Sequence, residues 1–164
     1  SGSNSPSPSP TAGLTTVFSD LIRWFVPCSD GNTYGFGNTG KIYKIDSELN
    51  VSQVYNQGEN IKGAEEEVTS TGKTYLIWAT NTNLHRKEIP GHSGWNDVDQ
   101  TVAGTQDPGW PKTNLTSADW HTMKQIGGAV EIANVAVLAK VGYDQSYTNN
   151  ALDLIPGNSI KTIV

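Results

Sequence analysis

The sequence predicts an all-β domain of repeated antiparallel units, and three observations lead to this fold class. The chain holds 17 glycines and 8 prolines but only 16% charged residues, a composition that favours many short strands over helices. Short apolar runs alternate with Asn, Asp and Gly turns, as in successive β-hairpins. A Gly-x-Thr-Tyr tetrapeptide occurs at 31–34 and again, 41 residues later, at 72–75, and each copy opens an apolar run.

The first unit spans about residues 14–58 and follows a Ser- and Pro-rich linker at residues 1–13. A linker of this composition buries little apolar surface and stays extended. Within the unit, Asp30-Gly31 and Asn38-Thr39-Gly40 are expected to form turns between strands. An amphipathic helix over 15–25 is the alternative for the start of the unit. The strands are expected at 21–26, 33–37, 41–45 and 51–55.

The second unit covers about residues 59–118 and the third about 119–159, so that the β domain as a whole spans 14–164. An insertion-like loop at 90–117, rich in Gly, Pro, Asp and Trp, sets the third unit back from the regular spacing. The last five residues, 160–164, have the composition of a strand that begins a further unit. The strands are expected at 64–68, 74–79 and 84–88 in the second unit, and at 121–125, 129–133, 136–141 and 151–154 in the third.

Matching positions of the three units are predicted to form the core between neighbouring units. Alternate residues of a strand share one face, so apolar residues two positions apart point the same way. A glycine opens the second strand of each unit and shapes the turn before it. The predicted core residues are Tyr34, Phe36, Tyr75, Ile77, Val130 and Ile132, and the predicted turn glycines are Gly31, Gly72 and Gly128.

A period of about 40–45 residues is typical of β-propeller blades. The predicted architecture is therefore a set of antiparallel propeller blades, about three to three and a half in number. Closed propellers have about four to eight blades, so this ring is expected to be incomplete. We expect the chain to assemble with its own copies or to be a portion of a longer propeller chain.

The hairpins opened by Gly-x-Thr-Tyr resemble β-propeller repeats of the kelch, Asp-box and NHL-like kinds. An Asp-box has the pattern Ser-x-Asp-x-Gly-x-Thr-Trp, and its second half is matched at 31–34 and at 72–75. Ser29 and Ser70 stand where the Asp-box has its aspartate, so the match is partial.

The segments 35–46, 118–121 and 141–157 are also similar in character to propeller-like virion proteins of bacteriophages and to related bacterial surface proteins. This resemblance implies a structural or attachment role at a virion or cell surface, in an extracellular setting. It implies no particular reaction.

Charge and hydropathy argue against two classes of partner. The net charge is −5 and no block of Lys or Arg stands out, so nucleic-acid binding is not expected. No stretch reaches the ~18 apolar residues that a membrane-spanning helix needs, so no membrane insertion is expected either.

No residue pattern marks out a catalytic, metal or cofactor site. The sequence has no nucleophile elbow and no phosphate-binding loop, and Cys28 is its only cysteine. The three histidines are scattered, and Asp97 and Asp99 offer too few ligands for calcium. We therefore expect no catalytic residue, no metal and no cofactor, while a fragment of a propeller glycosidase or lyase remains an alternative for the chain.

Aromatic residues in loops are the best candidates for ligand contact. Trp95 and Trp110 lie in the long loop, Trp120 follows it, and Tyr143 lies in the last connection. Exposed rings on a rigid β scaffold suit flat sugar rings or protein partners, although such rings can equally cover the ends of the sheets as core. The first hypothesis is thus a non-enzymatic structural or interaction module. A carbohydrate-binding module that contacts a glycan or a surface receptor through these rings is the main alternative.

Overall fold

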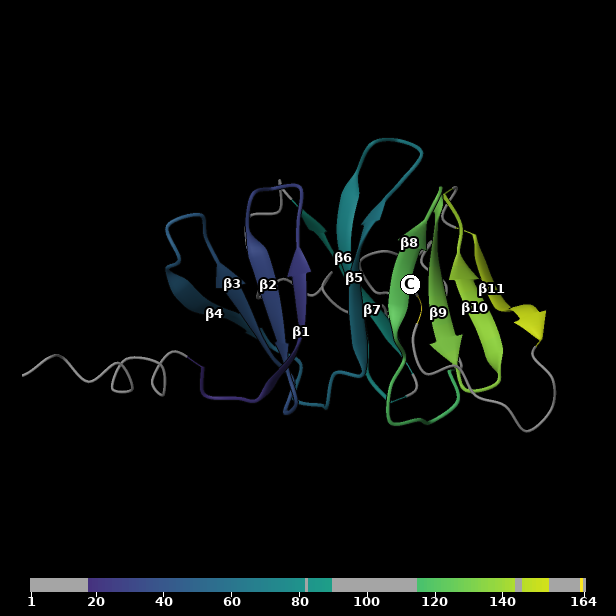
Figure 1. Ribbon diagram of the computed structural model, residues 1–164, viewed down its shortest axis with the longest axis horizontal. Helices are drawn as coiled ribbons and strands as arrows, with labels where there is room; N and C mark the ends of the chain where they lie inside the picture. Colours follow the sequence, from purple (N-terminus) through teal and green to yellow (C-terminus); the bar gives the residue numbers. More distant parts are fainter. Residues whose placement is uncertain (1–17, 82, 90–114, 144–145, 154–162, 164) are drawn as a thin grey trace, which may run out of the picture.

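The computed structural model describes residues 18–81, 83–89, 115–143, 146–153 and 163, and all regular structure in them is β (Figure 1). The strands form three antiparallel sheets of four, three and four strands, each made of consecutive strands. Figure 1 shows the three sheets side by side in chain order. Within the described ranges no helix is long and apolar enough to cross a membrane. The all-β antiparallel fold class is therefore confirmed.

Sheet 1 has the order β1-β2-β3-β4 and lies within the first predicted unit. Its strands are β1 (Ile22–Pro27), β2 (Thr33–Gly37), β3 (Lys41–Ile45) and β4 (Val51–Asn56). The helical alternative is wrong for residues 22–25, which belong to β1 and pair with β2. Alternation decides this, because Trp24 and Val26 pack inward while Phe25 is 54% exposed.

Sheets 2 and 3 follow, and their strands agree with the predicted ones except near their ends. Sheet 2 consists of β5 (Gly63–Val68), β6 (Thr74–Ala79) and β7 (Leu84–Ile89), and sheet 3 of β8 (Met123–Ile126), β9 (Ala129–Asn134), β10 (Val137–Val141) and β11 (Tyr147–Asp153). The strand expected at 121–125 begins later, because the backbone N–H of His121 donates to the carbonyl of Lys62. The last strand begins at Tyr147, earlier than expected. The linker at 1–13 and most of 160–164 lie outside the described residues.

The 41-residue repeat holds at the level of single hydrogen bonds. The N–H of Cys28 donates to the Asn32 carbonyl at 2.9 Å, and 41 residues later the N–H of Thr69 donates to the Lys73 carbonyl at 2.8 Å. The N–H of Gly31 donates to the carbonyl of Cys28, and the N–H of Gly72 donates to the carbonyl of Thr69. Their φ angles are +83° and +78°, a left-handed conformation that glycine adopts without strain.

The third unit has a different turn at the same place. Ile126 pairs with Ala129, so only two residues connect the strands. The glycine with a positive φ is Gly127 (+58°), so the expectation that Gly128 plays the part of Gly31 and Gly72 needs correction. Gly128 is needed for close approach, because a Cβ there would lie 2.9 Å from the Cβ of Tyr143.

Sheet 2 is buried on both faces by its neighbours. Leu76 and Trp78 share one hydrophobic cluster with Tyr34 and Phe36 of sheet 1. Ile77 points the other way and belongs to a second cluster, which contains Ala79, Leu84, Met123, Val130, Ile132, Ala139 and Val141. Consecutive residues of β6 thus serve two different cores, as the strand period of two requires.

Three predicted core positions behave differently from the simple repeat. Tyr75 is only partly buried, and its ring lies 4.2 Å from the guanidinium carbon of Arg86. Val130 and Ile132 are fully buried, but they face back towards sheet 2, whereas Tyr34 and Phe36 of sheet 1 face forward to it. A common face repeated through all three units is therefore wrong.

The charges of sheet 3 explain this reversal. Glu131 stands opposite Lys124 of β8 and Lys140 of β10, so a charged row crosses the face that Val130 and Ile132 do not use. Burying such a row against an apolar sheet would be unfavourable. The apolar face of sheet 3 therefore packs on sheet 2 and the charged face points outward.

Candidate functional site

The predicted ligand-binding residues do not converge on one place. Trp95 and Trp110 lie outside the described residues. Trp120 is 44% exposed and precedes β8, whereas Tyr143 is 48% exposed and follows β10. The carbonyl of Tyr143 accepts the N–H of Ser70, just beyond the end of β5, while Trp120 lies beside the start of β5. The backbone segments that carry the two rings therefore lie at opposite ends of β5, whose six residues span about 20 Å.

Trp120 lines a hollow at the end of the stack where β1, β5 and β8 begin. We name it the basal hollow. Its volume is about 180 Å³, and a shallower hollow of about 360 Å³ adjoins it and shares Arg23, Trp24 and Trp120. The basal hollow is lined by Arg23, Trp24, Asn38, Asn60, Ile61, Lys62, Asp119 and Trp120.

The walls of the basal hollow are tied together through the backbone. The indole N–H of Trp24 donates to the carbonyl of Ile61 at 3.3 Å, which joins β1 to the segment before β5. The N–H of Lys62 donates to the carbonyl of Ala79 at 2.7 Å, and its carbonyl accepts the N–H of His121 at 2.8 Å. Three chain segments that are distant in sequence therefore hold fixed positions around the hollow.

His121 anchors the segment that carries Trp120. Its side chain is fully buried, with Nδ1 2.8 Å from the carbonyl oxygen of Ala133 and Nε2 3.2 Å from that of Asn81. Gly63 lies so close that a Cβ there would overlap the His121 carbonyl oxygen. These contacts leave the neighbouring indole no deep core to enter, so Trp120 stays at the surface.

Arg23 faces Trp120 across the hollow. Its Nε donates to Oδ1 of Asn38 at 2.8 Å, and its guanidinium carbon lies 6.0 Å from the centroid of the Trp120 ring, within cation–π range. Because Asn38 accepts the hydrogen bond from Nε, the two terminal nitrogens of the Arg23 guanidinium are the donors that can bind a ligand. Sequence reasoning missed Arg23, although a lone cation in the apolar run Leu21–Val26 was the available signal.

Asp20 fixes the turn that carries Asn38. Its Oδ2 accepts the backbone N–H and the hydroxyl of Thr39, both at 2.8 Å, and the N–H of Lys41 at 3.4 Å. Burial acts to raise the pKa of Asp20, but the hydrogen bonds from Thr39 and Lys41 outweigh it and hold the pKa below its usual range. The ionised carboxylate is therefore the form that supports this end of sheet 1.

The acidic run of β5 joins sheets and leaves no acidic cleft. Glu66 points to sheet 1, where its Oε2 accepts the N–H of Ser29 at 2.6 Å. Glu65 points to sheet 3, where its Oε2 accepts the N–H of Gln125 at 3.3 Å. Neighbouring residues of β5 thus point to opposite faces, and each of these two carboxylates hydrogen-bonds to a neighbouring sheet.

Two groups that often carry chemistry have inert surroundings here. Burial, followed by the nearby carboxylate of Glu66, raises the pKa of the Cys28 thiol, so it stays protonated and unreactive. Burial lowers the pKa of His85 to about 4, and its ring stacks on Trp78 with centroids 5.8 Å apart. In the part of the chain that the structure describes, no three His, Cys, Asp or Glu side chains gather as metal ligands would.

Comparison with known proteins adds little to this geometry. No protein-family model matches the chain, and no curated protein sequence is similar to it. One solved structure, a protein of unknown function from Bacteroides caccae, is similar over 80% of this chain at 7% sequence identity, with a TM-score of 0.39. The chain spans 45% of the length of that protein.

Proposed function

We propose that this chain is a non-enzymatic structural or interaction module of a virion or cell surface, built from three propeller-type blades. Support comes from the first strands of the sheets, since β5 lies in contact with both β1 and β8. The innermost strands of neighbouring blades meet in this way around a propeller axis. In this proposal the module acts by presenting fixed surfaces, and it assembles with a second copy of itself.

The observation that carries the proposal is the contrast between the two outer faces of the stack. The outer face of sheet 3 has the charged row of Lys124, Glu131 and Lys140, which suits water, and it also carries the exposed Ile126 and Leu152. The corresponding row of sheet 1 consists of Phe25, Gly35 and Tyr43. A stack of repeats ends where a unit has a polar outer face, so sheet 3 is proposed as the capped end.

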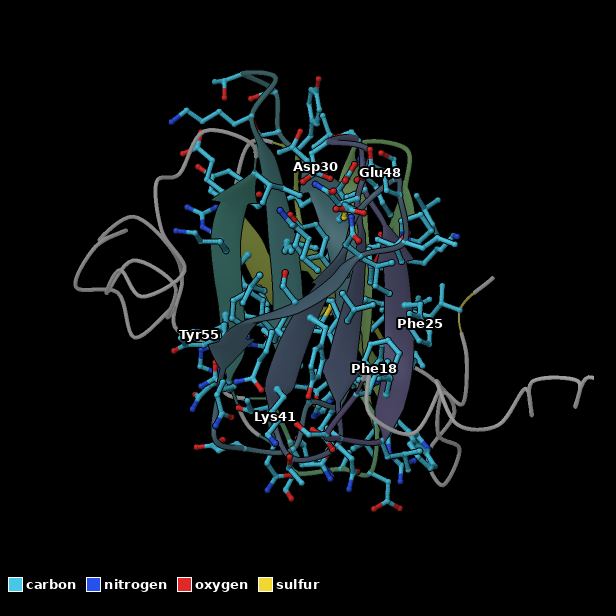
Figure 2. The ribbon with its side chains drawn as sticks, turned by 90° about the vertical axis from the view of Figure 1, so that its left-hand side faces the viewer. Phe18, Phe25, Asp30, Lys41, Glu48 and Tyr55 are labelled. Atoms are coloured by element: carbon cyan, nitrogen blue, oxygen red, sulfur yellow. The ribbon has the colours of Figure 1, made fainter. Side chains whose placement is uncertain are left out.

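The outer face of sheet 1 is rich in exposed or partly exposed apolar groups. Phe18 packs edge-on against Phe25 and Tyr43, with ring centroids 6.2 and 5.1 Å apart. Figure 2 labels Phe18 and Phe25, which lie close together on this face. Phe25 and Leu21 remain 54% and 63% exposed. Exposed apolar side chains on one face of a sheet suit an interaction surface.

A second copy is the partner that best fits a molecule with one apolar and one charged end. Head-to-tail stacking would place the apolar face of one copy on the charged row of another. Pairing sheet 1 with sheet 1 around a two-fold axis covers both apolar faces and closes the assembly. The two charged faces then remain in water.

Matched variants on the two outer faces test this proposal. We expect light scattering after size exclusion to give twice the 17.6 kDa mass of the chain. The substitution Phe25→Glu should give a monomer with an unchanged circular dichroism spectrum, because it places a charge in the interface. Ile126→Glu, on the 49% exposed Ile126 of sheet 3, should leave the dimer intact. A monomeric wild-type chain at about 100 µM, or dissociation by Ile126→Glu, contradicts the proposal.

The alternative of a glycosidase or lyase finds no support in the described residues. Glycoside hydrolysis needs two carboxyl groups facing each other across the scissile bond. Asp119 is the one carboxylate among the described residues that line the basal hollow. We therefore propose ligand binding for this hollow.

A further inference from the structure

We propose that the basal hollow binds a saccharide that carries a carboxylate, such as a uronic acid residue. The proposal does not depend on dimer formation, since it rests on Arg23 and Trp120 and not on the aromatic cluster of sheet 1, although Leu21 borders both places. The observations behind it are the ring of Trp120, the guanidinium of Arg23, the side-chain amides of Asn38 and Asn60, and the size of the hollow.

Trp120 provides an apolar surface for one face of a sugar ring. The indole is 44% exposed, and the buried, twice-contacted imidazole of His121 next to it keeps the segment in place. A flat ring held rigidly on a β scaffold loses little conformational entropy when a ligand stacks on it. An exposed Trp at a fixed position therefore suits the C–H face of a pyranose.

Arg23 provides the recognition of an anion. Asn38 holds the guanidinium at Nε, and the Trp120 ring lies 6.0 Å from its central carbon, so the fork is already oriented before a ligand arrives. A guanidinium fork binds a carboxylate through two parallel N–H···O bonds. Lys62 adds a second positive charge, against the single negative charge of Asp119. The lining is therefore net positive in a chain whose net charge is −5.

The remaining polar lining fits hydroxyl groups. The side-chain amides of Asn38 and Asn60 line the hollow, and an amide offers both donors and an acceptor. The volume of about 180 Å³ is smaller than the about 300–1,000 Å³ of sites for drug-sized ligands. The adjoining hollow continues past Trp120 over Leu21 and Ile22, so a second sugar unit has a surface to follow. One acidic sugar unit at the end of an oligosaccharide fits this shape.

The test compares an acidic sugar with its neutral counterpart, measured by isothermal titration and by the fluorescence of tryptophan. The probes are a glucuronate-containing disaccharide, the glucose disaccharide of the same linkage, and a short poly-glutamate peptide. We expect the acidic disaccharide to bind with a dissociation constant in the millimolar range or below, and about tenfold more tightly than the neutral one. The peptide, which offers carboxylates but no sugar ring, should bind at least tenfold more weakly than the acidic disaccharide.

Three variants locate the site. Arg23→Gln should bring the affinity ratio of acidic to neutral disaccharide close to one, because it removes the fork but keeps a polar side chain. Trp120→Ala should weaken both sugars. Lys124→Gln, on the exposed Lys124 of the outer face of sheet 3, removes one positive charge away from the hollow and should change neither affinity by more than about twofold.

Several results would overturn the proposal. If about 10 mM acidic disaccharide gives neither heat nor a fluorescence change, the hollow is not a saccharide site. Equal binding of the neutral sugar by the wild type would remove the role of Arg23, and equal binding of poly-glutamate would replace the saccharide by an acidic peptide. Both Arg23 and Trp120 lie at the surface, and an unchanged urea midpoint of each variant shows that a lost signal is not lost folding.

Discussion

Trp78 is the position at which the stacking of sheets 1 and 2 can be measured most sharply. It is fully buried, its ring centroid lies 6.1 Å from that of Phe36 and 6.3 Å from that of Tyr55, and its indole N–H donates to Oε1 of Gln57 at 3.0 Å. Replacement by phenylalanine keeps an aromatic ring but removes the donor and part of the buried area.

The expected loss of stability for Trp78→Phe is about 2 kcal/mol. Aromatic side chains bury about 150–250 Å², and a loss of about 50 Å² costs about 1 kcal/mol at 25 cal/mol per Å². The unpaired oxygen of Gln57 adds up to about 1 kcal/mol. The assay is urea unfolding followed by far-ultraviolet circular dichroism, with Trp120→Phe as the matched control at an exposed indole, which should change stability by less than about 0.5 kcal/mol.

A double-mutant cycle makes the test specific for two separate cores. Trp78→Phe should couple to Phe36→Leu by more than about 0.5 kcal/mol, because the two rings share one cluster. It should be additive with Ile132→Val, since Ile132 lies in the cluster on the other side of sheet 2. Equal losses at Trp78 and Trp120, or strong coupling between Trp78 and Ile132, would refute the reasoning.

Three further predictions concern pH and backbone packing. Burial lowers the pKa of His85 from 6.5 to about 4, so the unfolded chain takes up this proton at a higher pH than the folded chain does. The free energy of unfolding should therefore be constant above about pH 6.5 and fall between pH 6.5 and 4. Urea midpoints of His85→Phe should lack this pH dependence. The pKa of Asp20 is lowered in the folded chain, so its contribution to stability is present above the ordinary carboxyl pKa and is lost as pH falls through the folded-state pKa. Asp20→Asn should abolish this loss of stability at acid pH, and it should destabilise the chain by about 1 kcal/mol at neutral pH. Gly63→Ala should lower the melting temperature and disturb the fluorescence of Trp120, because its Cβ overlaps the carbonyl of His121, whereas Gly58→Ala, with no atom within 4 Å of the added Cβ, should leave that fluorescence unchanged.

Local patterns in the sequence were enough to place most strands. The alternation of apolar residues and the Gly-centred turns decide the pairing of Thr33–Gly37 with its neighbours on both sides, and the 41-residue spacing is matched by equivalent hydrogen bonds at Cys28 and Thr69. These features depend on residues close together in the chain, which is why sequence reasoning reaches them.

The direction that each sheet faces depends on contacts between sheets and was not predictable from the repeat alone. Val130 and Ile132 match Tyr75 and Ile77 by spacing, yet the charges of Lys124, Glu131 and Lys140 on the opposite face decide which side is buried. The charged row was visible in the sequence only once the pairing of three strands was known.

Of the two residues on which the candidate site mainly depends, the sequence pointed to one. Trp120 was predicted as a ligand contact, whereas Arg23 reaches the same hollow from a strand nearly a hundred residues earlier. Tyr143 was grouped with Trp120 as a loop aromatic, but the two belong to opposite ends of β5 and β8. Which loops share an end of the stack follows from strand direction and packing, not from residue type.

Hydroxyl-radical footprinting, read by mass spectrometry, tests most directly whether the outer face of sheet 1 is an assembly surface. We expect Phe25 to be protected at protein concentrations where the dimer forms and to become oxidised on dilution. Leu152, 56% exposed on the charged side of sheet 3, should be oxidised at all concentrations. If Phe25 is oxidised as readily as Leu152 at every concentration, no second copy covers this face and the central claim is contradicted.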